Sequence, residues 1–107
     1  MAKVFIDGRN VQRSRWPNLS DEELVERARA WAERHGHEVV IVFDGQGPAG
    51  AVSSGRETAD DWLIREVPRH PGAWLVTSDR ALGEAAGSKS ERIIGGGAFL
   101  TELLRHR

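Results

Sequence analysis

The sequence contains no cysteine, which excludes disulfide bonds and thiolate zinc sites. It has no apolar run close to the roughly 20 residues that a membrane-spanning helix needs. Its first residues also lack the basic and apolar regions of a signal peptide. The formal net charge is −1, so no overall excess of positive charge points to nucleic acid. We therefore expect a cytoplasmic protein that has no membrane partner.

The residues that are present have the composition of an ordinary globular protein. Of the 107 residues, 39% are hydrophobic and 29% are charged, which is typical of a soluble domain with a true core. We expect one domain over residues 1–107. Thirteen of the 15 cationic side chains are arginine, the residue that binds phosphate by a planar fork. Genome composition explains this abundance equally well.

Short β-branched runs alternate with helical patterns along the chain. Strands are predicted for residues 3–7, 38–43, 51–53, 73–77 and 91–94. Helices are predicted for residues 20–35, 58–67 and 78–87 and after residue 97, and residues 8–19 are predicted to form a loop. This order indicates a small three-layer α/β fold around a mostly parallel sheet of four to five strands.

Four aspartates fall at the predicted ends of these elements. Asp7, Asp44 and Asp79 each follow a strand, and Asp60 opens a helix. Ligands of parallel sheets bind at the carboxyl ends of the strands, so these side chains are expected to meet there. Gathered carboxylates repel one another unless a cation compensates, and Mg²⁺ and Mn²⁺ prefer oxygen ligands. One such aspartate alone is more often a helix cap, so the predicted metal site depends on all four.

Polar neighbours of these acids are further candidates. Asn10, Thr77 and Ser78 could orient the acids or bind phosphate, although Asn10 is equally well explained as a turn former. The helix start at 78–79 is predicted to offer free backbone N–H groups to an anion. Asp61 stands beside Asp60 but has capping-box spacing from Thr58, and a cap is its favoured role.

Arginines surround the predicted acidic site. Arg9, Arg13 and Arg15 follow the first strand and Arg80 follows Asp79, so they are candidates for binding an RNA backbone. Trp16 lies beside Arg15. It could stack on an RNA base, but a position covering the core is the favoured interpretation.

Four motifs in this order resemble the YacP-like branch of the NYN domains, in the PIN-like nuclease superfamily. Residues 4–11 (VFIDGRNV) resemble the opening strand and "DGYN" loop of those domains, with arginine in place of the usual tyrosine. Residues 42–45 (VFDG), 57–61 (ETADD) and 76–79 (VTSD) resemble their second strand, helix start and later strand end. The resemblance covers nearly the whole chain and places the family acid of the third motif on Asp60.

This resemblance implies a Mg²⁺- or Mn²⁺-dependent endoribonuclease. The catalytic and metal-binding residues that it implies are Asp7, Asp44, Asp60 and Asp79. The stretch between Asp44 and Asp60 is shorter than in those domains, which motivates an alternative, a non-catalytic RNA-binding or assembly module. A DNA-directed or flap-type nuclease is a third hypothesis. The sequence leaves open a homodimer and a ribosomal or RNA-processing partner.

Overall fold

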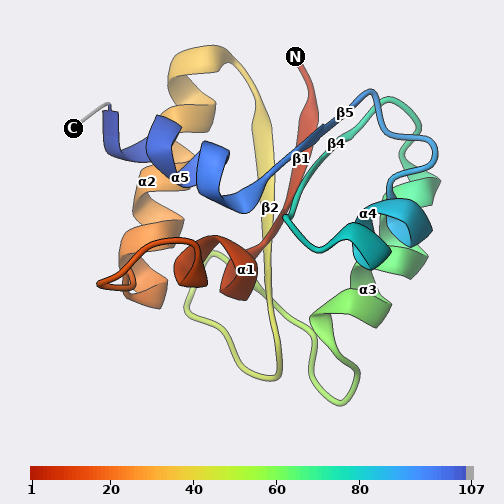
Figure 1. The fold of residues 1–107 in the computed structure, drawn as a ribbon, viewed down its shortest axis with the longest axis horizontal. Helices are drawn as coiled ribbons and strands as arrows, with labels where there is room; N and C mark the ends of the chain where they lie inside the picture. The colour runs from red at the N-terminus through yellow and green to blue at the C-terminus, as the bar shows by residue number, and fades with distance from the viewer. Residues whose placement is uncertain (106–107) are drawn as a thin grey trace.

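The computed structural model describes residues 1–105 (Figure 1). Its strands are β1 (Lys3–Asp7), β2 (Glu38–Phe43), β3 (Val52–Ser53), β4 (Trp74–Val76) and β5 (Arg92–Ile94). Its helices are α1 (Gly8–Arg13), α2 (Asp21–His35), α3 (Ala59–Glu66), the 3-10 helix Val67–Arg69, α4 (Arg80–Ala86) and α5 (Gly96–Arg105). None of the helices in this range is both long enough and apolar enough to cross a membrane.

The strands form one parallel sheet in the order β3-β2-β1-β4-β5. The central strand β1 pairs with β2 on one side and with β4 on the other, so that Ile6 lies opposite both Ile41 and Val76. The predicted α/β fold is therefore confirmed, with five strands among the described residues. This register brings the carboxyl ends of β1, β2 and β4 to one edge of the sheet.

Alternate residues of each strand point to opposite faces of the sheet, and each face has its own core. On one face, Val4 and Ile6 belong to a cluster with residues of α1, α2 and α5. On the other face, Phe5 and Leu75 belong to a cluster with residues of α3 and α4. Figure 1 shows the three layers that result, with α1, α2 and α5 on one side of the sheet and α3 and α4 on the other. Burial on both faces explains why the strands are continuously apolar.

The predicted caps Ser20 and Thr58 and the predicted stop at Gly36 are confirmed, whereas α5 begins at Gly96 rather than after residue 97. The Ser20 hydroxyl accepts a hydrogen bond of 3.1 Å from the Glu23 backbone N–H, and the Thr58 hydroxyl accepts one of 3.0 Å from Asp61 N–H. Gly36 ends α2 with a φ of 70°, which glycine adopts at no steric cost.

The predicted loop over residues 8–19 is wrong in its first half. Residues 8–13 form α1 directly after β1, with Val11 and Gln12 buried. A six-residue helix is too short to show the apolar period of a helix face, and it begins with glycine, a poor helix former. The glycine is required here, because a Cβ on Gly8 would lie 2.8 Å from the Phe43 ring. Packing against β2 therefore overrides local propensity.

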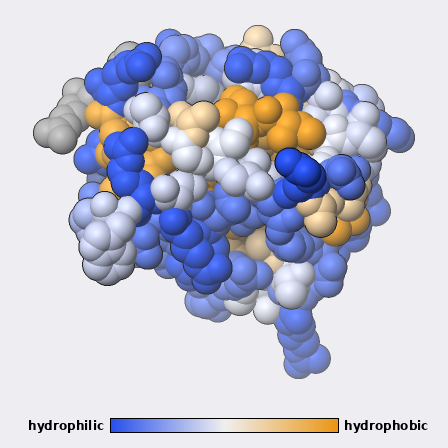
Figure 2. Space-filling view, in the orientation of Figure 1, coloured by the Kyte–Doolittle hydropathy of each residue, from blue (hydrophilic) through white to orange (hydrophobic). Residues whose placement is uncertain are grey.

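The molecular surface seen in Figure 2 is mainly hydrophilic. Its upper part carries a hydrophobic area where β5 lies in Figure 1, and Ile93 of that strand is 51% exposed. This strand forms one edge of the sheet.

Candidate active site

The carboxyl edge of the sheet brings together the four predicted aspartates. Asp7 ends β1, Asp44 follows β2, Asp79 caps α4 after β4, and Asp60 lies in the first turn of α3. Their charges act on one another. Repulsion from Asp60 and Asp44 contributes to a raised pKa at Asp7, and repulsion from Asp79, Asp44 and Asp61 contributes to a raised pKa at Asp60.

Asp7 is the buried member of this group, with 6% of its surface exposed. Burial is the main reason that its pKa lies above the ordinary value, because a carboxylate loses hydration there. A hydrogen bond of 3.1 Å from the Thr77 hydroxyl to Asp7 Oδ2 opposes the shift. At Asp60, which is exposed, loss of hydration is again the largest cause of the raised pKa.

Two of the acids also hold the fold. Asp44 Oδ1 accepts a hydrogen bond of 2.7 Å from the backbone N–H of Ala59 at the start of α3. Asp79 Oδ1 accepts one of 3.0 Å from Leu82 N–H and so caps α4. Each of these hydrogen bonds uses one carboxylate oxygen, and both residues are exposed. A capping role and a ligand role are therefore compatible in the same side chain.

Thr77 connects two of the acids. Its buried hydroxyl donates to Asp7 Oδ2 and accepts a hydrogen bond of 3.1 Å from the backbone N–H of Asp79. A single hydroxyl thus fixes the last residue of β1 relative to the cap of α4.

Asn10 and Ser78 form a second set of contacts beside it. Asn10 Oδ1 accepts a hydrogen bond of 2.8 Å from Ser78 N–H, and the Ser78 hydroxyl accepts one of 2.7 Å from Gly96 N–H. The prediction that the backbone N–H groups at 78–79 are free to bind an anion is therefore wrong, because Asn10 and Thr77 already accept hydrogen bonds from them. Asn10 lies 68 residues before Ser78 in the chain, so this acceptor leaves no local sequence signal.

The donor set suits a hard divalent cation. It consists of carboxylate oxygens, and repulsion between the acids, which a cation would relieve, contributes to the raised pKa of Asp7 and Asp60. Within residues 1–105, however, no three Asp, Glu or His side chains are placed closely enough to hold one metal ion in common. The carboxylates approach one another without converging on one point.

Arg9, a predicted phosphate-binding residue, is engaged within the protein. Its guanidinium donates to Asp21 Oδ1 at 2.7 Å and to Gln12 Oε1 at 2.9 Å, and it lies 4.9 Å from the centre of the Phe43 ring. Hydrogen bonds from Gln12 and Arg9 lower the pKa of Asp21. This network ties α1 to α2.

Of the other predicted arginines, Arg13 and Arg80 line two hollows that share Ser78, the residue before Asp79. Arg13 lines a hollow of about 340 Å³ together with Asn10, Ser14, Ser78 and Gly97. Arg80 lines one of about 440 Å³ with residues that include Ser78, Asp79 and Ile93. Arg15 donates a hydrogen bond of 3.1 Å to the Thr101 hydroxyl of α5. Ser14 and Gly97 were not among the predicted site residues, because neither is part of a recognisable motif.

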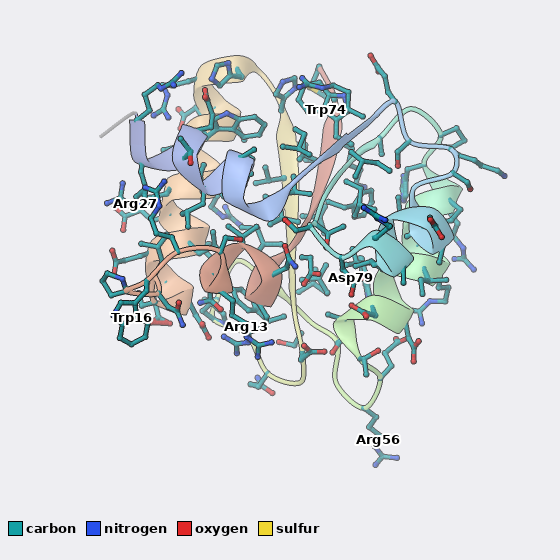
Figure 3. All side chains as sticks on the ribbon, viewed as in Figure 1. Arg13, Trp16, Arg27, Arg56, Trp74 and Asp79 are labelled. Atoms are coloured by element: carbon teal, nitrogen blue, oxygen red, sulfur yellow. The ribbon has the colours of Figure 1, made fainter. Side chains whose placement is uncertain are left out.

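Trp16 does not cover the core. Its side chain is 85% exposed and projects from the loop after α1 (Figure 3). The favoured sequence interpretation is therefore wrong for this residue. Leu19, three residues later, packs against the core instead.

These observations define a parallel α/β protein with acidic residues at the carboxyl edge of its sheet, and comparison with solved structures shows a YacP-like fold. A crystal structure of a point mutant of Rae1 (YacP) from Bacillus subtilis superposes with a TM-score of 0.77 at 20% sequence identity, over 98% of this chain and 76% of that chain. A second crystal structure of Rae1 (YacP) gives a TM-score of 0.72 at 18% identity, over 98% and 75%. No protein-family model and no curated protein sequence matches the chain.

Proposed function

We propose that this protein is a metal-dependent endoribonuclease. The observation that carries the proposal is the acidic edge, where loss of hydration and repulsion from neighbouring aspartates raise the pKa of Asp7 and Asp60. The YacP-like fold and the four sequence motifs support the same assignment. Perturbed pKa values cluster at functional sites.

In this proposal Asp7, Asp44, Asp60 and Asp79 would supply carboxylate oxygens to one or more Mg²⁺ or Mn²⁺ ions. A bound divalent cation of this kind supplies a nucleophilic water and neutralises charge on the phosphate. Thr77 orients Asp7 through its hydroxyl, and Asn10 holds the backbone at Ser78. These two residues act through the acids that they position, and Asp61 adds negative charge beside Asp60.

The RNA backbone runs across the same edge in this proposal. The hollows that contain Arg13 and Arg80 share Ser78 in their linings, so the two cations line hollows that meet next to Asp79. Arginine suits this contact because its planar guanidinium binds phosphate oxygens and neutralises backbone charge.

The direct test is cleavage of a labelled single-stranded RNA by the purified protein. Cleavage is expected with Mg²⁺ or Mn²⁺ and is expected to stop with EDTA. Asp7→Asn should reduce the rate by at least about a thousandfold, which corresponds to about 4 kcal/mol. Glu33→Gln removes one negative charge from the exposed surface of α2 and should leave the rate unchanged. Full activity of Asp7→Asn would contradict the mechanism.

A non-catalytic RNA-binding or assembly module is the second candidate. The observation that favours it is the absence, within residues 1–105, of three side chains placed to share one metal ion. RNA binding without cleavage at any divalent cation would support this candidate. Cleavage of a DNA flap in preference to RNA would instead assign the acidic edge to a DNA-directed nuclease.

A further inference from the structure

Trp16 is the most exposed large hydrophobic side chain in the described part of the chain apart from Met1. Figure 3 shows its ring projecting from the loop that follows α1, away from the body of the protein. Single exposed apolar residues are common on protein surfaces, so exposure alone indicates nothing. The hydrogen bonds that fix the surrounding loop are the second observation, because they hold Trp16 in an exposed position.

The loop is fastened on both sides of the tryptophan. Before it, Arg15 donates to the Thr101 hydroxyl of α5. After it, the Asn18 carboxamide nitrogen donates to the backbone carbonyls of Gln12 and Arg15 at 3.0 and 3.1 Å, in the amide orientation that places its nitrogen toward these acceptors. Gln12 Nε2 donates to the Leu19 carbonyl at 3.1 Å. A loop fixed in this way holds the indole ring in solvent, and little conformational entropy is left to be lost when a ligand binds.

The surroundings of Trp16 are cationic on the side that leads to the acids. In Figure 3 Arg13 lies between Trp16 and Asp79. Arg13 also lines the hollow that reaches Ser78, the residue before Asp79. Helix α1 has six residues and so spans about 9 Å between Asp7 and this loop. An RNA strand that runs from Asp79 past Ser78 and Arg13 would therefore reach Trp16 within a few nucleotides.

We propose that Trp16 stacks on a base of single-stranded RNA, at a position away from the cleaved bond. This inference rests on the proposed function, because it names how the same substrate is held. An exposed aromatic ring beside cations is the arrangement by which proteins bind single strands with little sequence preference. Arginines on the path from the ring to the acids favour a polyanion over an apolar protein partner.

The test is binding of a short fluorescent single-stranded RNA in EDTA, measured by anisotropy so that cleavage does not interfere. Trp16→Ala should weaken binding about 5- to 150-fold, the range for one lost base stack. Trp16→Phe should keep most of the affinity because it keeps an aromatic face. Trp16→Leu should behave like Trp16→Ala, because it keeps apolar volume and loses that face. The melting temperature should not change in any of them, since the side chain is exposed.

Salt dependence separates stacking from phosphate binding. Trp16→Ala should leave the slope of log affinity against log salt unchanged, whereas Arg13→Ala should reduce it by about one charge. Arg34→Ala, an exposed arginine in the last turn of α2, is the matched control and should change neither affinity nor slope.

Two results would overturn the inference. One is unchanged RNA affinity in Trp16→Ala, and the other is wild-type affinity in Trp16→Leu, which would indicate an apolar contact such as a protein partner makes. A wild-type protein that does not bind RNA overturns it as well. If RNA binding depends on Trp16 but the protein cleaves no RNA with any divalent cation, the stacking proposal is supported and the proposed ribonuclease activity is contradicted.

Discussion

The two ends of the parallel sheet have opposite chemistry. The carboxyl end carries Asp7 and its three acidic neighbours, whose mutual repulsion contributes to the raised pKa of both Asp7 and Asp60. The amino end carries aromatic rings in contact. Trp31 and Phe99 meet edge to face at 5.0 Å, and the His37 and Trp74 rings lie 4.6 Å apart. Arg92 lies 4.5 Å from the centre of the Trp74 ring.

This difference shows how stability and chemistry are divided along the same strands. Aromatic pairs contribute about 0.5–1.5 kcal/mol each beyond the area that they bury, so the amino end stabilises the fold. Gathered carboxylates destabilise it, and such a cost persists only where the surrounding structure maintains it. Substitutions at the two ends should therefore have opposite effects on stability, and the predictions below test that contrast.

The largest effect is expected at the amino end. Phe99 is buried against Trp31, and Phe99→Ala should lower the free energy of unfolding by about 3–5 kcal/mol. The melting temperature should fall by about 4–8 °C for each kcal/mol. Ile64→Ala, at a partly exposed position on α3, should cost much less. Equal losses in the two variants, measured by thermal or urea unfolding, would show that the aromatic end has no special role.

The next effect concerns Thr77, which connects Asp7 to Asp79. Thr77→Val keeps the shape and removes the hydroxyl, so the buried hydrogen bond to Asp7 and the half-buried one from Asp79 N–H are both lost. A buried polar group left unsatisfied costs about 1–3 kcal/mol. Thr77→Ser keeps the hydroxyl and should recover most of the stability in urea unfolding. If the valine and serine variants have the same free energy of unfolding, the two hydrogen bonds of the Thr77 hydroxyl do not contribute to stability.

The smallest effect is a gain at the carboxyl end. Asp60→Asn removes one charge from the cluster and should raise the melting temperature in EDTA by a few degrees. If the Asp60→Asn protein is instead less stable than wild type in EDTA, the carboxylate has a structural role.

The gain from Asp60→Asn should depend on pH. The pKa of Asp60 is raised in the folded protein, so the Asp60 carboxylate binds a proton more tightly in the folded state than in the unfolded chain. Wild type therefore loses stability as the pH rises from the ordinary value of 3.8 through the raised pKa. Asn does not titrate, so its advantage should be complete at neutral pH and should vanish below 3.8. A gain that is constant across this range would exclude repulsion as its cause.

The sequence predicts the carboxyl end better than its surroundings. Asp7, Asp44 and Asp79 follow apolar runs, and parallel pairing then brings them to one edge because the register is shared. Ser20 and Thr58 are predictable as caps since their partners lie three residues away. All of these signals are local, or depend only on the order of the strands.

The remaining features depend on contacts between distant residues. Arg9 pairs with Asp21 across twelve positions, and Asn10 binds Ser78 across 68. No local pattern specifies either partner, so Arg9 was predicted to be available for phosphate and the N–H of Ser78 to be free. Trp16 was assigned to the core because tryptophan is usually well buried, and its loop is instead held in place by Thr101 and Leu19.

The central claim is that the acidic edge holds a divalent cation, and its most direct test is the melting temperature during a Mn²⁺ titration. Wild type and Glu33→Gln should be stabilised, by about 2.7 kcal/mol once Mn²⁺ reaches a hundred times its dissociation constant. Asp7→Asn and Asp60→Asn should show little or none of this stabilisation. If these two variants respond to Mn²⁺ as wild type does, the four aspartates do not form the metal site.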